Sequence, residues 1–181
     1  MNDKTNKALL IIDVINHFQF DHGMDKLKQS LQLLPSLLQL KKRAKERQIP
    51  VIYINDHYNL WQADFKKIIS HCTTEHNEDF LTQIKPNEDD YFLIKPKHSA
   101  FYGTALNTLL FHLHIKHLII TGIAGNICVL FTANDAYMRD YTLHCPKDCI
   151  ASVDEQDNLY ALTMMKNVLD ADLTESSKIN L

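Results

Sequence analysis

Five short, continuous runs of apolar and β-branched residues recur along the chain, and longer segments separate them. The runs are residues 8–12, 51–54, 91–94, 117–121 and 141–144. A strand with one face in water alternates apolar and polar residues, so uninterrupted apolar runs indicate strands that are covered on both faces. The connecting segments are long enough for helical crossovers. The pattern therefore predicts a parallel sheet.

Three of the connecting segments have helical patterning. The first repeats leucine every three or four residues, at Leu27, Leu31, Leu34, Leu37 and Leu38. It ends in the basic residues of 41–47, which suit a helix C-terminus. Residues 104–113 follow a Gly-Thr cap, and residues 154–169 begin at Asp154, a favourable N-cap. We expect a three-layer α/β/α sandwich with a mostly parallel sheet of five strands, or six if residues 171–174 add an edge.

Length and composition favour a single domain over residues 1–181. Of these 181 residues, 45% are hydrophobic, and no stretch rich in Gly, Ser and Pro divides the chain. The net charge of −3, with no basic run longer than Lys41-Lys42-Arg43, argues against a nucleic-acid partner. No apolar stretch reaches the roughly 20 residues of a membrane span, and residues 1–7 do not lead into a secretory signal. We expect a cytoplasmic location, in which the four cysteines are free thiols.

Polar residues follow the predicted strands at the edge where open parallel sheets bind ligands. Asp13 directly follows the first run, Lys95 follows the third, and Cys128 stands after the loop that follows the fourth. A carboxylate at this partly desolvated edge needs a partner, and Lys95 can supply one. Taken alone, Asp13 and Lys95 are also consistent with a simple ion pair that closes the sheet, although this is the less favoured interpretation.

Cys128 adds a nucleophile to this pair. It opens a segment with helical spacing, residues 129–138. A thiol at a helix N-terminus beside a cation is expected to have a lowered pKa. The preceding loop, residues 122–127, has small side chains that leave its backbone N–H groups accessible. Two such donors near the sulfur would bind the oxyanion of an acyl-transfer intermediate. The loop lacks the glycine spacing of phosphate-binding loops.

Three blocks of the sequence occur in a characteristic order. They are ALLIIDVINHF at residues 8–18, LIKPKHSAFYGT at 93–104 and TGIAGNICV at 121–129. Together they resemble the isochorismatase-like cysteine hydrolases, a family that includes nicotinamidases and the carbamoylsarcosine and ureidoacrylate amidohydrolases. The resemblance covers nearly the whole chain. It is specific for the three blocks in combination, whereas each block alone is only moderately specific.

The resemblance implies a catalytic triad of Asp13, Lys95 and Cys128. Lys97 lies two residues beyond the family's lysine position and is interpreted as a flanking charge. In the implied mechanism, Asp13 accepts the thiol proton and Cys128 attacks an amide or carbamoyl carbon. Water then cleaves the thioacyl intermediate, while Lys95 orients Asp13.

The resemblance also implies a cis peptide bond between Ile123 and Ala124. The N–H groups of Ala124 and Cys128 would then form the oxyanion hole. For the substrate pocket we expect contributions from loop residues above the sheet: Phe18, Trp61, Phe101, Tyr102 and Asn126. Core packing is an equally good interpretation of the four aromatic residues.

The chain departs from the family pattern in two places. Metal-binding nicotinamidases have an Asp-x-His motif followed by another His, whereas here Asp56 is present and Tyr58 stands where a His is needed. We therefore expect neither a metal nor a cofactor, and we rank nicotinamide below other amides as substrate. Ile15 and His17 flank Asn16 where the family has Gln and Asp, which affects the expected pocket rim.

The remaining His and Cys residues are interpreted as structural. His112 and His114 would point apart on a helix, which disfavours a metal site there. Cys145 and Cys149 have no second Cys pair with which to bind zinc. Cys72 follows a histidine on an expected helix and is assigned to packing.

These features predict a cysteine-dependent hydrolase that cleaves a C–N bond of a small amide, carbamoyl or ureido compound. Two alternatives stay open. One is an isochorismate-type vinyl ether hydrolase, although members of that branch dispense with the cysteine. The other is a catalytically silent member that binds a metabolite or a partner protein. The resemblance further implies a homo-oligomer, a dimer or tetramer, that acts on a small molecule and binds neither nucleic acid nor a membrane.

Overall fold

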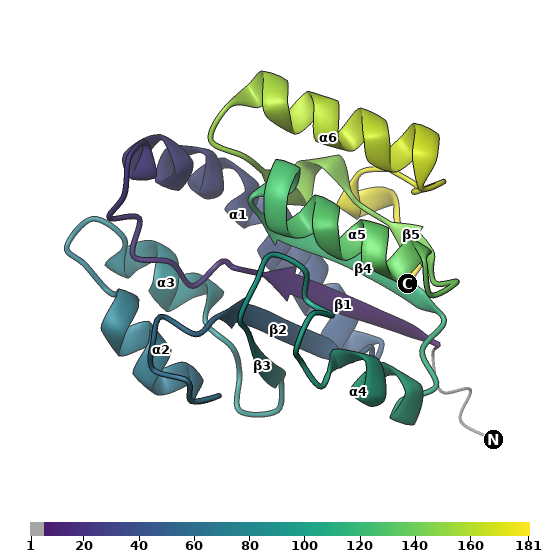
Figure 1. Ribbon diagram of the computed structural model, residues 1–181, viewed down its shortest axis with the longest axis horizontal. Helices are drawn as coiled ribbons and strands as arrows, with labels where there is room; N and C mark the ends of the chain where they lie inside the picture. Colours follow the sequence, from purple (N-terminus) through teal and green to yellow (C-terminus); the bar gives the residue numbers. More distant parts are fainter. Residues whose placement is uncertain (1–5) are drawn as a thin grey trace.

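The computed structural model, which describes residues 6–181, has a parallel sheet between two layers of helices (Figure 1). The strands are β1 (Lys7–Ile12), β2 (Val51–Asp56), β3 (Tyr91–Lys95), β4 (His117–Ile123), β5 (Thr142–His144) and β6 (Ile150–Ala151). The helices are α1 (Gly23–Glu46), α2 (Phe65–Cys72), α3 (Glu78–Ile84), α4 (Leu106–His112), α5 (Leu130–Tyr137) and α6 (Glu155–Val168). A π-helical turn (Gly125–Val129) and two 3-10 turns (Lys147–Cys149 and Ser176–Lys178) complete the elements.

The strand order places a topological switch beside β1. The order is β3-β2-β1-β4-β5, with β6 on the end of β4, and every pairing is parallel. The chain leaves β1 toward β2 and β3, then returns to the other side of β1 to form β4. Ile12 therefore lies opposite Gly122, and the carboxyl ends of β1 and β4 meet where ligands bind in such sheets.

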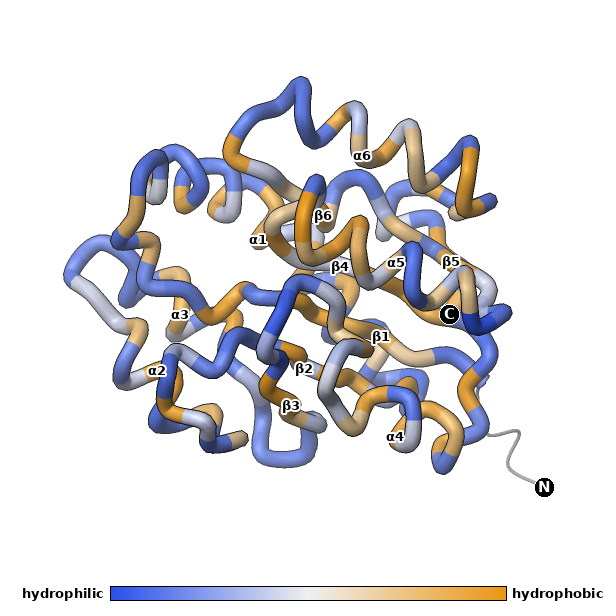
Figure 2. Tube along the Cα trace, in the orientation of Figure 1, coloured by the Kyte–Doolittle hydropathy of each residue, from blue (hydrophilic) through white to orange (hydrophobic). Residues whose placement is uncertain are grey.

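Alternate residues of the central strands pack against opposite helix layers. Leu9 and Ile11 of β1 face the layer of α1, α2 and α3, whereas Leu10 and Ile12 face the layer of α4, α5 and α6. Both sets are fully buried, which is why the strands read as continuous apolar runs. Figure 2 shows this concentration of apolar residues along β1, β2 and β4. The three-layer fold class is confirmed.

The five predicted strands are confirmed, and the sixth is elsewhere than expected. Residues 171–174 contribute only an isolated bridge, between Asp172 and His144. Asp172 bonds to both neighbours of His144, but β5 has only three residues, so it offers little length for pairing. The sixth strand is β6, which pairs with Gly122 and Ile123 at the end of β4.

Side-chain hydrogen bonds show where two of the helices begin. The Asp154 carboxylate accepts hydrogen bonds from the N–H groups of Gln156 and Asp157, at 2.8 and 3.0 Å, as its position predicts. The Thr104 hydroxyl accepts from Leu106 N at 3.1 Å, so α4 begins at Leu106 rather than at residue 104. The leucine-rich helix α1 begins earlier than its first leucine, at Gly23.

No helix within residues 6–181 is long and apolar enough to cross a membrane. Residues 1–5, on which the expected lack of a secretory signal partly depends, lie outside the described range.

A buried ion pair connects α1 to the turn that leads into β3. Lys41 Nζ lies 2.8 Å from Asp90 Oδ2, and their side chains are 9% and 0% exposed. Asp90 also accepts from Lys45 Nζ at 2.9 Å and from the backbone N–H of Asn87 at 2.8 Å. Burial lowers the pKa of Lys41, and the bond to Asp90 opposes this effect. The turn before β3, and hence the position of Lys95, depends on this carboxylate.

Replacing Asp90 with Ala is expected to lower the free energy of unfolding by about 3 to 5 kcal/mol, because it leaves a buried ammonium without its partner. Asp89 is the matched control: it also binds Lys45, at 2.6 Å, but its side chain is 72% exposed. Asp89→Ala is expected to cost less than about 1 kcal/mol. Urea unfolding followed by circular dichroism measures both values. Equal costs for the two variants would contradict the structural role given to Asp90.

Candidate active site

Asp13, Lys95 and Cys128 lie together at the carboxyl edge of the sheet. Lys95 Nζ lies 2.7 Å from Asp13 Oδ2 and 3.5 Å from Cys128 Sγ. The side chains of Lys95 and Asp13 are buried, and Cys128 is half-buried. Lys95 Nζ also donates to the carbonyl of Lys97 at 3.0 Å, so Lys97 contributes its backbone and not its ammonium. The ion pair between Asp13 and Lys95 is therefore present, and the Cys128 sulfur lies beside it.

Two neighbouring strands hold the Asp13 carboxylate in place. Asp13 follows β1 with a positive φ of 52°, which Asp tolerates better than most residues. Its backbone N–H donates to Ile54 O of β2 at 3.0 Å. Its Oδ1 accepts from Asp56 N at 2.9 Å, which leaves Oδ2 to Lys95. Both carboxylate oxygens thus have fixed partners.

The loop after β4 positions Cys128 opposite Asp13. The Ile123–Ala124 peptide bond is cis. The Ala124 carbonyl accepts from Ile127 N and from Val129 N, each at 3.1 Å, and these bonds form the π-helical turn that contains Cys128. Asn126 N donates to the Ser152 hydroxyl at 3.0 Å, which connects the turn to the segment after β6.

Gly122 allows β4 to approach the end of β1 closely. Its φ is 120°, a conformation that side-chain-bearing residues rarely adopt. A Cβ at this position would lie 2.1 Å from Ile12 O, a backbone atom that cannot move aside cheaply. The glycine therefore permits the close approach that brings the Cys128 turn to Asp13.

The pKa of the Cys128 thiol is shifted in the direction opposite to the one predicted. Burial, and to a smaller extent the Asp13 carboxylate, raise the pKa of the Cys128 thiol to about 12, although Lys95 acts in the opposite direction. The predicted lowering was wrong because the sequence shows a helix start but not the burial of the sulfur or its contact with a carboxylate. Burial tends to lower the pKa of Lys95, but Asp13 and Cys128 raise it overall. The resting site therefore contains a thiol, a carboxylate and an ammonium.

A cavity of about 450 Å³ opens above these groups. Asp13, Lys95, Cys128 and Ala124 all contribute to its wall. The proposed oxyanion-hole residues thus face the same space as the sulfur. The other lining residues are Asn16, His17, Phe20, Lys26, Asp56, Tyr58, Pro96, Lys97, His98 and Ile127.

Two of the expected pocket residues lie in the core instead. Phe18 is buried among the residues that face α1, where its ring meets that of Phe80 at a centroid distance of 6.0 Å. Phe101 is buried on the opposite side of the sheet, and its ring lies 6.1 Å from that of Tyr141. Neither lines the cavity, so core packing is the correct interpretation for both.

The other three expected pocket residues also lie away from the cavity lining. Trp61 is 64% exposed, and its ring stacks on His57 at 3.8 Å. Tyr102 is largely exposed. Asn126 is tied by its backbone to Ser152 and by its amide to Asp157. These side chains follow local loop conformation, which the sequence pattern did not reveal.

The aromatic groups that do line the cavity are Phe20 and Tyr58. Phe20 follows the first sequence block by two residues, and Tyr58 is the departure from the Asp-x-His motif. Proximity to these motifs was the available sequence signal. His98, which also faces the cavity, lies inside the second sequence block, whereas Lys26 had no comparable signal.

The residues near Tyr58 do not supply a set of metal ligands. The Tyr58 hydroxyl donates to Ile15 O at 3.0 Å, and Asp56 Oδ1 accepts from Tyr58 N at 2.7 Å. Within residues 6–181, no group of three His, Cys, Asp or Glu residues has the arrangement needed to hold a metal ion. The donors at this position therefore do not fit the metal of metal-binding nicotinamidases.

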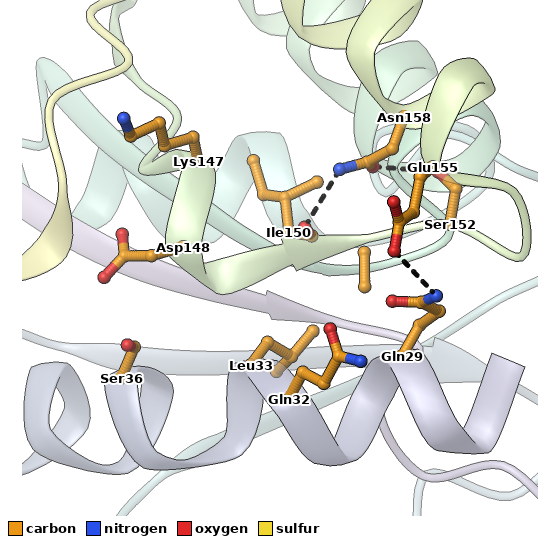
Figure 3. A pocket seen from close by; sticks show the side chains of 11 residues that line it. Gln29, Gln32, Leu33, Ser36, Lys147, Asp148, Ile150, Ser152, Glu155 and Asn158 are labelled. Carbon is orange, nitrogen blue, oxygen red and sulfur yellow. Dashed lines mark hydrogen bonds between the residues drawn. The ribbon is translucent and has the colours of Figure 1, made fainter.

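A second cavity, of about 330 Å³, lies between α1 and the segment from β6 to α6 (Figure 3). Its polar groups bind one another: Gln29 donates to Glu155 at 3.5 Å, and the Ser152 hydroxyl donates to Asn158 at 2.9 Å. Since the Ser152 hydroxyl also accepts from Asn126 N, this network connects the Cys128 turn to the segment between β6 and α6.

Comparisons with known proteins agree with the architecture. The protein-family model of the isochorismatase domain matches residues 7–176 of this chain. YaaI of Bacillus subtilis, an uncharacterized isochorismatase family protein, is 59% identical over 176 residues, which are 97% of each chain.

Solved structures give similar folds. The nicotinamidase of Staphylococcus aureus superposes with a TM-score of 0.74 at 25% identity, over 94% of this chain and 99% of that one. The N-carbamoylsarcosine amidase of Thermoplasma acidophilum has a TM-score of 0.74 at 23% identity, over 98% and 100% of the two chains. At that identity the second match shows a shared fold alone.

Replacing Asp13 with Asn is expected to speed the alkylation of Cys128 by iodoacetamide at pH 8. The carboxylate raises the pKa of the thiol, so its removal lowers that pKa and increases the thiolate fraction. A rate increase of roughly tenfold corresponds to one pKa unit. Mass spectrometry of the Cys128 peptide at timed points measures the rate.

Asp56→Asn is the matched control, because Asp56 lines the same cavity but is not among the groups that shift the Cys128 pKa. Its alkylation rate should equal that of the wild type. In the wild type the rate should keep rising up to pH 10, since the thiol pKa is about 12. An unchanged or slower rate in Asp13→Asn would show that Asp13 does not control the thiol.

Proposed function

Since the chain belongs to the isochorismatase family of hydrolases, we propose that it is a cysteine hydrolase that cleaves the C–N bond of a small amide, carbamoyl or ureido compound. One observation carries the proposal: an ammonium contacts both a carboxylate and a thiol in the wall of one cavity, at 2.7 and 3.5 Å. A carboxylate, a thiol and backbone donors are the groups that acyl transfer requires.

The first step couples proton transfer to attack. Because the thiol is protonated in the resting site, Asp13 accepts its proton as the sulfur attacks the carbonyl carbon. A new S–C bond forms, and the carbonyl π electrons move to the oxygen. Lys95 stays beside both groups and stabilises the negative charge as it moves from the carboxylate to the sulfur.

The N–H groups of Ala124 and Cys128 bind the oxyanion of the tetrahedral intermediate in this mechanism. The C–N bond then breaks, and Asp13 returns the proton to the departing nitrogen as ammonia or an amine leaves. A water molecule gives its proton to Asp13 and attacks the thioester. Cleavage of the C–S bond, with return of the proton to sulfur, releases the acid or carbamate and restores the thiol.

The half-buried position of Cys128 on the cavity favours this mechanism over its two alternatives. Vinyl ether hydrolysis of an isochorismate-like acid has no use for a nucleophilic sulfur. A silent binding protein has no need of a carboxylate beside that sulfur. The other three cysteines, Cys72, Cys145 and Cys149, are buried in the core.

Cys128→Ala is expected to reduce ammonia release by at least about a thousandfold, because the covalent route is lost. The assay screens small amides, carbamoyl compounds and ureides with the wild type and the variant. Cys145→Ala serves as the matched control, since it removes a buried thiol of the α4–α6 layer and should keep the activity. Circular dichroism checks that both variants are folded.

The other outcomes are distinct from this result. Ammonia release that survives in Cys128→Ala would exclude the thioacyl mechanism. Release of enolpyruvate without ammonia from an isochorismate-like acid would support the vinyl ether alternative. A wild type that binds compounds from the panel and hydrolyses none of them would identify a silent member.

A further inference from the structure

A second lysine faces the cavity and has no part in the mechanism above. Lys26 lies in the first turns of α1, is half-buried, and lines the same cavity as Cys128. Across residues 6–181, its ammonium has neither a hydrogen bond nor an ion pair with another side chain. Its contact is with the ring of Phe20, whose centroid lies 5.3 Å from Nζ.

This ammonium is in an unfavourable position without a ligand. Burial lowers the pKa of Lys26, and the neighbouring Lys95 lowers it further, while Asp13 and Cys128 oppose this effect. A charge that is partly removed from water is costly unless an opposite charge compensates for it. Asp13 is already held by Lys95 and by Asp56 N, so it does not fill this role.

The charges of the cavity wall indicate which kind of ligand compensates for Lys26. In the cavity wall Lys95 is paired with Asp13, which leaves the single positive charge of Lys26, beside Phe20, without an opposite charge in contact. A singly charged carboxylate balances this one ammonium, whereas a doubly charged phosphate exceeds it. Phe20 adds an apolar surface beside the ammonium, which suits the carbon chain of a small organic acid.

His17 adds a donor to the same part of the cavity. Its Nδ1 accepts from Gln19 N at 2.8 Å, so the ring proton of the neutral form lies on Nε2. The ring packs edge-on against Phe20, with a centroid distance of 6.2 Å. The Lys26 ammonium and the His17 ring therefore both lie beside Phe20.

We propose that Lys26 binds a carboxylate of the substrate, so that the enzyme acts on small amides or ureides that carry a carboxylate near the scissile carbonyl. The assignment of substrate class rests on the proposed hydrolase function. The binding of a carboxylate beside Cys128 does not, and it can be tested without turnover.

Iodoacetate and iodoacetamide form a matched pair of probes for this site. Both transfer a two-carbon group to sulfur with loss of iodide, and they differ in carrying a carboxylate or a neutral amide. The measured quantity is the ratio of their alkylation rates at Cys128, followed by mass spectrometry. Because any change in thiolate fraction affects both reagents equally, the ratio reports only the preference for the carboxylate. The same ratio for N-acetylcysteinamide, a neutral free thiol, provides the reference.

In the wild type, the ratio is expected to exceed the reference by about tenfold, which is the usual size of a charged hydrogen bond. Lys26→Met should reduce it to the reference value. Lys26→Arg should keep it high. Lys28→Met is the matched control, since Lys28 is an exposed lysine on the same helix and does not line the cavity. Its ratio should equal that of the wild type.

Equal ratios in the wild type and Lys26→Met would overturn the proposal, as would a wild-type ratio at or below the reference. The wild-type measurement decides the matter even if Lys26→Met does not fold. Because the assay needs no turnover, a high ratio in a protein that hydrolyses no amide would support the carboxylate site and contradict the hydrolase.

Discussion

The ion pair between Asp13 and Lys95 is the interaction on which the site depends. Both charges are buried, and such pairs are tolerated only where further hydrogen bonds complete them. Here the bonds come from the backbone: Asp56 N donates to one Asp13 oxygen, and Lys97 O accepts from Lys95. Since Lys95 ends β3 and Asp13 follows β1, the order of the strands itself fixes the pair. The close approach of β4 to β1 at Gly122 then brings the Cys128 turn to this pair and completes the site.

Sequence patterns predicted the sheet and two of the three central residues, Asp13 and Lys95, for the same physical reason. A strand covered on both faces must be apolar throughout, so the first polar residue after it marks the exposed edge. Asp13 and Lys95 are both such residues, and parallel strands bring their carboxyl ends together. The prediction of the sixth strand was wrong because residues 171–174 and Ile150–Ala151 are both short. Only the course of the chain decides that Ile150–Ala151 pairs with β4, while Asp172 makes a single bridge to β5.

The pocket walls and the thiol pKa could not be predicted in this way. Phe18 has a φ of 56° and Trp61 a φ of 51°, so the backbone turns at each of them and directs the side chain independently of any periodic pattern. The side chain of Phe18 thereby enters the core, and that of Trp61 faces solvent. Lys26 could not be predicted because it lies inside a helix rather than at a strand end. The pKa of Cys128 depends on burial and on the approach of Asp13, which are properties of the fold.

The raised thiol pKa also determines how the site can work. A cysteine that is ionised at rest needs only a nearby cation, and a neighbouring carboxylate would hinder it. A cysteine that is protonated at rest needs a proton acceptor at the moment of attack, and Asp13 lies where that acceptor must be. Lys95 contacts both groups, so in the proposed mechanism the ammonium lies beside the negative charge both on Asp13 and on the attacking sulfur. In the proposed mechanism, the carboxylate that raises the pKa of the thiol is thus also the group that accepts the thiol proton when the sulfur attacks.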